Sequence, residues 1–127
     1  MVTNGFKKML AEANAVIETT SIQDALGLVG DPNVAFIDIR ETVERQQTGS
    51  VQGAVHAPRG LLEFIADPEG PMHNDVFASG KKLLLFCASG GRSALAAKTL
   101  QDMGLGNVAH IAGGYAAWRE AGGPVED

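Results

Sequence analysis

Short apolar segments alternate with helical segments along most of the chain, and this alternation limits the possible folds more than any other feature. Segments rich in β-branched and aromatic residues predict strands, and the segments between them have helical periodicity. The predicted strands cover residues 16–21, 34–39, 53–58, 81–87 and 107–112, and the predicted helical segments cover 22–30, 41–49, 60–67, 92–104 and 113–122. Strands that alternate with helices favour an α/β domain with a largely parallel sheet.

The first 16 residues predict an amphipathic helix, which precedes a domain that we place at residues 17–127. Lysines and glutamates lie within this segment, so it lacks the apolar stretch of a signal peptide and the roughly 20 apolar residues of a membrane span. We therefore expect a cytoplasmic protein. The apolar stripe of this helix fits either packing on the domain or dimerisation, and it consists of Phe6, Met9, Leu10 and Ala13.

Charge and cysteine content argue against several classes of function. The net charge of −5 repels the phosphates of nucleic acid and the anionic lipids of a membrane, so we expect neither as a partner. The single cysteine excludes an intramolecular disulfide. The three histidines show no metal-ligand spacing, and the chain has no dinucleotide or Walker motif. We therefore predict no metal site and no cofactor.

Polar residues and glycines follow the predicted strands, where a parallel sheet forms its ligand site. This edge is expected to hold Asp38, Arg40, His56, Arg59, Cys87, Gly113 and Gly114. We expect Asp38 and Arg40 to form a structural ion pair and His56 to be a hydrogen-bonded strand-end residue. Arg59 either contacts a substrate or lies on the surface.

Cys87, the only cysteine, ends the strand at 81–87 and is followed by a glycine-containing turn into a helix. This turn can direct backbone N–H groups at the sulfur, and it consists of Ala88, Ser89, Gly90, Gly91, Arg92 and Ser93. The helix N-terminus and Arg92 add positive charge. These surroundings favour the thiolate, so we predict that Cys87 is a nucleophile inside an anion-binding loop.

Four segments of the chain, in order, resemble the rhodanese-like sulfurtransferase family. They are "FIDIRETVE", "GSVQGAVHAP", "CASGGRS" and "GGYAAWREAGGPVE", and the resemblance covers residues 18–126. The first contains Asp38, Arg40 and Glu44, which match the family's aspartate-x-arginine strand end with a glutamate four residues later. The resemblance implies a three-layer α/β fold with a mainly parallel five-stranded sheet flanked by helices, and a cysteine that forms a persulfide.

The resemblance also implies a reaction. The thiolate of Cys87 would take the outer sulfur of a small donor such as thiosulfate or a persulfide, and would pass it to a thiol acceptor, a protein thiol among the candidates, or to cyanide. The loop residues from Ala88 to Ser93 would bind the donor. From its place after the strand at 53–58, Arg59 is a further candidate for donor binding. Ala88 and Ser89 stand where relatives specialised for thiosulfate carry extra positive charge, which weakens the attraction for a doubly charged donor.

Two alternatives remain open at this stage. One is a cysteine phosphatase or arsenate reductase on a related scaffold. The span of six residues from Cys87 to Arg92 argues against it, because the loop of such phosphatases has one residue more. The other is a non-catalytic rhodanese-like binding module in which the thiol has no chemical role.

Overall fold

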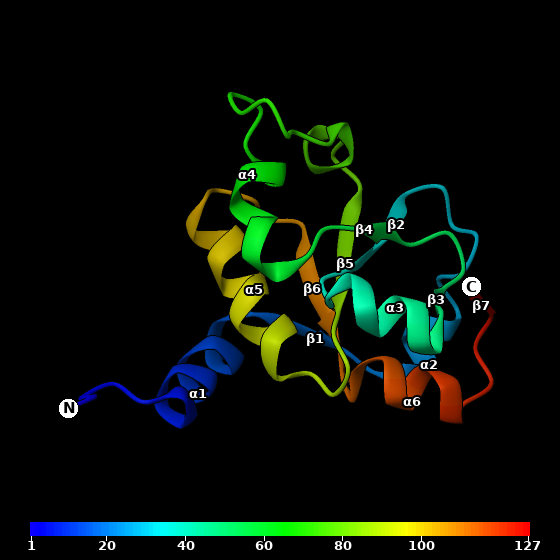
Figure 1. Cartoon of the computed structure of the whole chain (residues 1–127), viewed down its shortest axis with the longest axis horizontal. Helices are drawn as coiled ribbons and strands as arrows, with labels where there is room; N and C mark the ends of the chain where they lie inside the picture. Colours follow the sequence, from blue (N-terminus) through cyan, green and yellow to red (C-terminus); the bar gives the residue numbers. More distant parts are fainter.

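Five parallel strands form the central sheet, in the order β1-β6-β5-β2-β4. The computed structural model describes residues 1–127 (Figure 1). The strands are β1 (Glu18–Thr20), β2 (Val34–Asp38), β4 (Val55–His56), β5 (Lys82–Phe86) and β6 (Val108–Ile111). β5 lies at the centre of the sheet between β6 and β2, where a parallel strand is covered on both faces. After Lys82 it is the continuous apolar run that this position requires. The predicted five-stranded parallel sheet is confirmed.

Helices cover both faces of this sheet and produce three layers (Figure 1). Because side chains alternate along a strand, Leu83 and Leu85 of β5 pack on one face and Leu84 and Phe86 on the other. The first face carries α1 (Phe6–Val16), α4 (Leu62–Ala66) and α5 (Gly91–Asp102), and the second carries α2 (Ile22–Leu26) and α6 (Gly114–Glu120). None of the helices is both long enough and apolar enough to cross a membrane.

Most of the predicted elements are present, although the N-terminal helix begins at Phe6 rather than at residue 1. Two further differences concern other segments. The helix predicted at 22–30 ends at Leu26, after which bonds of the i to i−3 type carry the chain to Gly30. Gly27 is a weak helix former, which favours this tighter continuation. The second difference is a small antiparallel pair, β3 (Ser50–Val51) with β7 (Val125–Glu126), which the pattern did not predict. Strands of two residues have too little alternation to be detected.

The N-terminal helix α1 lies against α5 (Figure 1). Of its apolar stripe, Ala13 is fully buried and Leu10 packs against the core, whereas Phe6 and Met9 are exposed. The stripe therefore divides into an inner half that holds the helix on the domain and an outer half that faces solvent.

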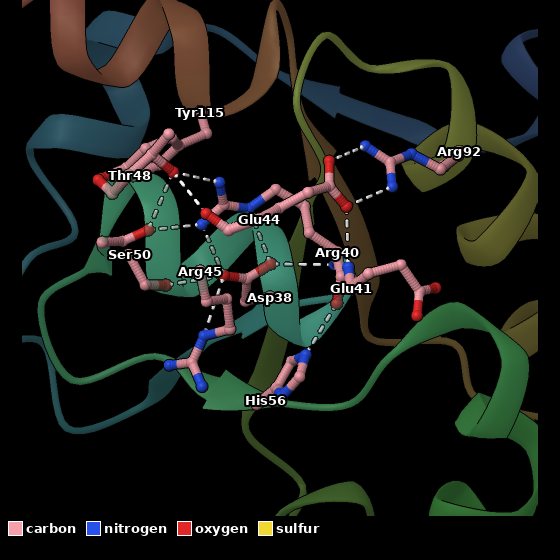
Figure 2. Close-up of polar contacts among 11 residues, drawn as sticks. Asp38, Arg40, Glu41, Glu44, Arg45, Thr48, Ser50, His56, Arg92 and Tyr115 are labelled. Atoms are coloured by element: carbon pink, nitrogen blue, oxygen red, sulfur yellow. Dashed lines mark hydrogen bonds and ion pairs between the residues drawn. The ribbon is translucent and has the colours of Figure 1, made fainter. Parts of the chain in front are cut away.

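A buried ion pair occupies the carboxyl end of β2 (Figure 2). Both carboxylate oxygens of Asp38 bind Arg40, at 3.1 Å from Nε and 2.9 Å from Nη2, and Ser50 Oγ donates to Asp38 Oδ2 at 2.8 Å. Arg40 is 2% exposed, and its guanidinium also donates to Thr48 Oγ1 and to the carbonyl of Gly49. These bonds fix the C-terminal end of α3 (Thr42–Thr48) to the end of β2. The predicted structural pair is confirmed.

Replacing Asp38 with Asn is expected to leave the Arg40 guanidinium buried without a counter-charge. We expect the free energy of unfolding to fall by about 3–5 kcal/mol, which corresponds to a decrease in Tm of roughly 10–20 °C for a domain of this size. The control is Asp102→Asn at the exposed Lys98–Asp102 pair, where the cost is about 0.5 kcal/mol or less. Thermal unfolding of both variants measures the difference, and equal losses would contradict the structural importance of the buried pair.

Candidate active site

Cys87 lies directly after β5, and a short loop carries the chain from it into α5. The residue is 1% exposed and packs at the edge of the core on the α5 side of the sheet. Burial of this degree is also common for cysteines that have no chemical role. The groups around the sulfur therefore decide between a packing role and a reactive one.

The sulfur of Cys87 accepts hydrogen bonds from the loop and from the first turn of α5. The donors are the amides of Gly90 at 3.1 Å and Ser93 at 3.4 Å, and the hydroxyl of Ser93 lies 3.5 Å from the sulfur. Gly90 has a φ of 115°, which only glycine adopts without strain, and this conformation lets the chain turn over the sulfur. An ordinary packed cysteine has no such set of donors.

Two opposing effects act on the pKa of the Cys87 thiol. Burial raises the pKa, because it disfavours the charged form. Hydrogen bonds from the Ser93 hydroxyl and from the amides of Ser93, Gly90 and Ser89 lower it, and together they outweigh the burial. The pKa of Cys87 is therefore below its ordinary value, and the thiolate is favoured.

The carbonyl groups of the loop point away from the sulfur, toward the N-terminus of α6. The amide of Tyr115 donates to the carbonyl of Cys87 at 2.8 Å, and the amide of Ala116 donates to that of Ala88 at 3.1 Å. Gly114 has a φ of 60°, and a Cβ on it would overlap the carbonyl of Cys87. With the carbonyl groups of Cys87 and Ala88 held by α6, the amides of the loop remain available for an anion.

Arg92 forms a bidentate ion pair with Glu44 of α3 (Figure 2). Arg92 Nη1 donates to Glu44 Oε2 and Nη2 donates to Oε1, each at 2.8 Å. Glu44 Oε2 also accepts from the amide of Glu41 at 2.8 Å and completes a capping box at the start of α3. Hydrogen bonding to Arg92 lowers the pKa of Glu44 to about 2 and raises the pKa of Arg92. The one cation of the loop is thus already neutralised.

Two cavities flank this ion pair. Arg92 lines a cavity of about 380 Å³ together with Arg59, Leu95, Thr99 and Met9. Glu44 lines a second cavity of about 350 Å³, to which Ala88, Tyr115 and Arg119 also contribute. Both cavities adjoin the loop, and each offers space for a small molecule beside it.

The structure brings some of the predicted site residues to the sulfur and places others elsewhere. Ser89, Gly90 and Ser93 supply the donors, whereas the side chain of Arg92 turns to Glu44 and no hydrogen bond joins Ala88 or Gly91 to the sulfur. Arg59 binds Glu63 at 3.0 Å and Thr99 at 3.3 Å along the first cavity. No group of three or more His, Cys, Asp or Glu side chains forms a metal site.

Two histidines of the chain lie close to these elements. His56 contacts the carbonyl of Arg40 at 2.7 Å through Nε2, as expected for a strand-end residue. His110 is 4% exposed, and its Nδ1 lies 2.9 Å from Ser93 Oγ. The sequence analysis placed His110 only in a buried strand. The only sequence signal that His110 has a hydrogen-bond partner is its position as a polar residue in an otherwise apolar strand.

Comparisons with known proteins agree with this geometry. Residues 21–121 match the family described as Rhodanese-like domain. The chain is 32% identical over 95 residues to Thiosulfate sulfurtransferase 16, chloroplastic, from Arabidopsis thaliana, and the match covers 72% of this chain and 78% of that protein.

Solved structures are similar over almost the whole chain. A protein of unknown function from Rhodopseudomonas palustris, described as a possible tyrosine phosphatase, is 49% identical with a TM-score of 0.95, and the match covers 99% of this chain and 97% of that one. The polysulfide-sulfur transferase homodimer from Wolinella succinogenes is 29% identical with a TM-score of 0.71, and the match covers 96% and 87%.

The lowered pKa of Cys87 predicts how its reactivity depends on pH. We expect the rate of alkylation by iodoacetamide to rise with pH and to reach its midpoint below that of a free cysteine peptide under the same conditions. The midpoint, unlike the absolute rate, does not depend on how easily the reagent reaches the buried sulfur. A midpoint equal to that of the free peptide would contradict the stabilisation of the thiolate.

The pair of Glu44 with Arg92 predicts a pH-dependent contribution to stability. The pKa of Glu44 in the folded protein is about 2, below its ordinary value of 4.5, so the contribution is complete above about pH 4.5 and disappears as the pH falls through 2. We expect Glu44→Gln, which keeps an acceptor for the Glu41 amide, to lower the free energy of unfolding by about 1 kcal/mol at pH 7. In urea titrations the difference in the free energy of unfolding between Glu44→Gln and the original protein should decrease between pH 4.5 and 2. A difference that does not depend on pH would refute the stabilising role of the ionised Glu44.

Proposed function

The chain belongs to the rhodanese-like domain family, and we propose that it is a sulfurtransferase that carries sulfane sulfur as a persulfide on Cys87. The observation that supports this most directly is the hydrogen bonding of the sulfur. The amides of Gly90 and Ser93, with the Ser93 hydroxyl, surround an atom that has no need of them in a packing role. Such donors stabilise a thiolate, which is the nucleophile in sulfur exchange.

The proposed cycle has two half-reactions. In the first, the thiolate of Cys87 attacks the outer sulfur of a persulfide donor R–S–SH; the donor S–S bond breaks, its electron pair leaves with R–S⁻, and Cys87 becomes Cys–S–SH. In the second, an acceptor thiolate attacks the outer sulfur on Cys87. The bond between the two sulfurs breaks, its electron pair returns to the cysteine sulfur, and the acceptor departs as a persulfide. The two steps predict ping-pong kinetics.

The charge of the site bears on the choice of donor. Glu44 neutralises Arg92, so the sulfur is stabilised by neutral donors and by the dipole of α5 rather than by a free cation. This arrangement attracts a dianion such as thiosulfate weakly. We therefore propose a persulfide or an organic polysulfide, whose sulfur chain carries at most one negative charge, as the better donor, and a thiol of a small molecule or of a protein as the acceptor. The name of the W. succinogenes relative is consistent with a polysulfide donor.

A phosphatase is the second candidate, because the R. palustris protein is described as a possible tyrosine phosphatase. The short span from Cys87 to Arg92 and the pairing of Arg92 with Glu44 both favour sulfur transfer, since phosphate needs a wider loop and a free guanidinium. Hydrolysis of an aryl phosphate, or reduction of arsenate, that disappears in Cys87→Ser would support this candidate. The remaining alternative, a non-catalytic binding module, would require that Cys87 show no reactivity above that of a free cysteine.

Intact mass spectrometry tests the proposed function directly. Incubation of the reduced protein with polysulfide is expected to add one sulfur atom, about 32 Da, to Cys87, and reductant or cyanide should remove it. Thiosulfate is expected to load the protein more slowly. Cys87→Ser is the control and should gain no mass. An unchanged mass of the original protein with both donors would count against sulfur transfer.

A further inference from the structure

A chain of hydrogen-bonding side chains runs from the candidate nucleophile across two strands. The Ser93 hydroxyl lies 3.5 Å from the Cys87 sulfur, His110 Nδ1 lies 2.9 Å from Ser93 Oγ, and Thr19 Oγ1 lies 3.2 Å from His110 Nε2. Ser93 is fully buried and His110 is 4% exposed. β1 and β6 pair in a register that sets Thr19 directly beside His110. Nothing in the sulfur-transfer cycle described above uses His110 or Thr19.

The hydrogens available in this chain allow two arrangements. Ser93 has one hydroxyl hydrogen, for which the Cys87 sulfur, His110 Nδ1 and the carbonyl of Gly90 at 3.3 Å are alternative acceptors. If His110 carries its hydrogen on Nε2, Nδ1 is an acceptor and competes with the sulfur for that hydrogen. If His110 carries it on Nδ1, it donates to Ser93 Oγ, and the hydroxyl is free to donate to the sulfur. Thr19 then donates to Nε2.

We propose that His110 is a positioning residue, which as the Nδ1–H form directs the Ser93 hydroxyl hydrogen at the sulfur of Cys87 whenever that sulfur is anionic. The inference rests on the proposed persulfide chemistry for its role in turnover. His110 acts only through Ser93, which is the group that touches the reacting atom. The direction of these hydrogen bonds reverses when the sulfur is a neutral thiol, because the S–H can then donate to Ser93 Oγ and the hydroxyl can donate to Nδ1.

The two half-reactions use this hydrogen bond differently. In the second, the cysteine sulfur is the leaving group, and a donor that stabilises the departing thiolate speeds the step. In the first, the same donor raises the thiolate fraction but lowers the nucleophilicity of each thiolate. Loss of the bond should therefore slow discharge at every pH, and slow loading only where the thiol is not fully ionised.

Few charged groups face the hydrogen-bonded series of Cys87, Ser93, His110 and Thr19. They are Cys87 itself, Arg92 at the start of α5 and Glu44 of α3, which is paired with Arg92. On β1, Thr19 is uncharged, and on β5 the residue in register with His110 is Leu85. Burial lowers the pKa of His110, so the ring is neutral at pH 7 and the choice between its two forms is a real one.

Single-turnover measurements on three variants test the proposal. Persulfide discharge to a thiol is expected to slow by about tenfold in Ser93→Ala and by about threefold in His110→Gln, whose amide can reach the site of Nε2 but not that of Nδ1. His110→Asn places an amide at the site of Nδ1 and should restore the rate. In Ser93→Ala, a further His110→Gln change should have no effect, because His110 acts through the missing hydroxyl.

The controls separate this proposal from the proposed function. Loading at a pH where Cys87 is fully ionised should be unchanged or slightly faster in His110→Gln, which a general loss of structure would not produce. Additive effects of the two changes, or a discharge rate of His110→Gln equal to the original, would overturn the role of His110 and leave sulfur transfer standing. Failure of the original protein to load would instead refute the proposed function.

A measurement on the original protein needs no variant. The ¹⁵N chemical shifts of a histidine ring distinguish its two neutral forms. At a pH above the measured alkylation midpoint of Cys87, where the thiolate predominates, we expect His110 to carry its hydrogen on Nδ1. Hydrogen on Nε2 in that state would overturn the proposal, even if His110→Gln did not fold.

Discussion

The reactivity of this site depends on the stabilisation of a buried sulfur anion by neutral hydrogen-bond donors. A cation beside a thiolate would also lower the pKa of the thiol. The one cation of the loop, Arg92, is instead bound through Nη1 and Nη2 by Glu44. The thiolate therefore relies on the amides of Ser89, Gly90 and Ser93, the Ser93 hydroxyl and the N-terminus of α5. Dipoles that are fixed by the fold keep their orientation whether the sulfur is charged or neutral. They therefore suit the proposed cycle, in which the cysteine sulfur loses its negative charge during loading and regains it during discharge.

These dipoles are fixed because a continuous set of polar contacts joins the core to the loop (Figure 2). Asp38 and Arg40 anchor α3 to the end of β2, and α3 in turn presents Glu44 to Arg92. On the other side, Tyr115 lies against the Arg40 guanidinium at 4.1 Å and donates to the carbonyl of Thr48 at 2.6 Å, while its own amide holds the carbonyl of Cys87. The same helix, α6, thus braces both α3 and the loop.

Much of this arrangement could be predicted from the sequence, and the reason lies in the spacing of local signals. The apolar run at 81–87 and the turn after it are local signals that place Cys87 at the end of a strand without information from distant residues. The glycines Gly90 and Gly114 likewise occupy positions of positive φ. Contacts between distant strands could not be predicted. Thr19 and His110 are 91 positions apart, and their meeting depends on the register of β1 on β6. The partner of Arg92 depends likewise on where α3 begins, and the pair of β3 with β7 depends on the path of the C-terminus.

The burial of Cys87 is compatible with the proposed role in sulfur transfer. When Cys87 holds a persulfide, the atom that an acceptor attacks is the outer sulfur, which stands about 2 Å beyond the buried one. The cysteine sulfur can therefore remain among its donors throughout discharge. During loading the donor must reach the buried atom, and a slender S–S end can enter a loop of this size more easily than a tetrahedral phosphate, whose oxygens all require partners. A confined sulfur with neutral donors and a paired arginine thus supports the proposed persulfide exchange rather than phosphate chemistry.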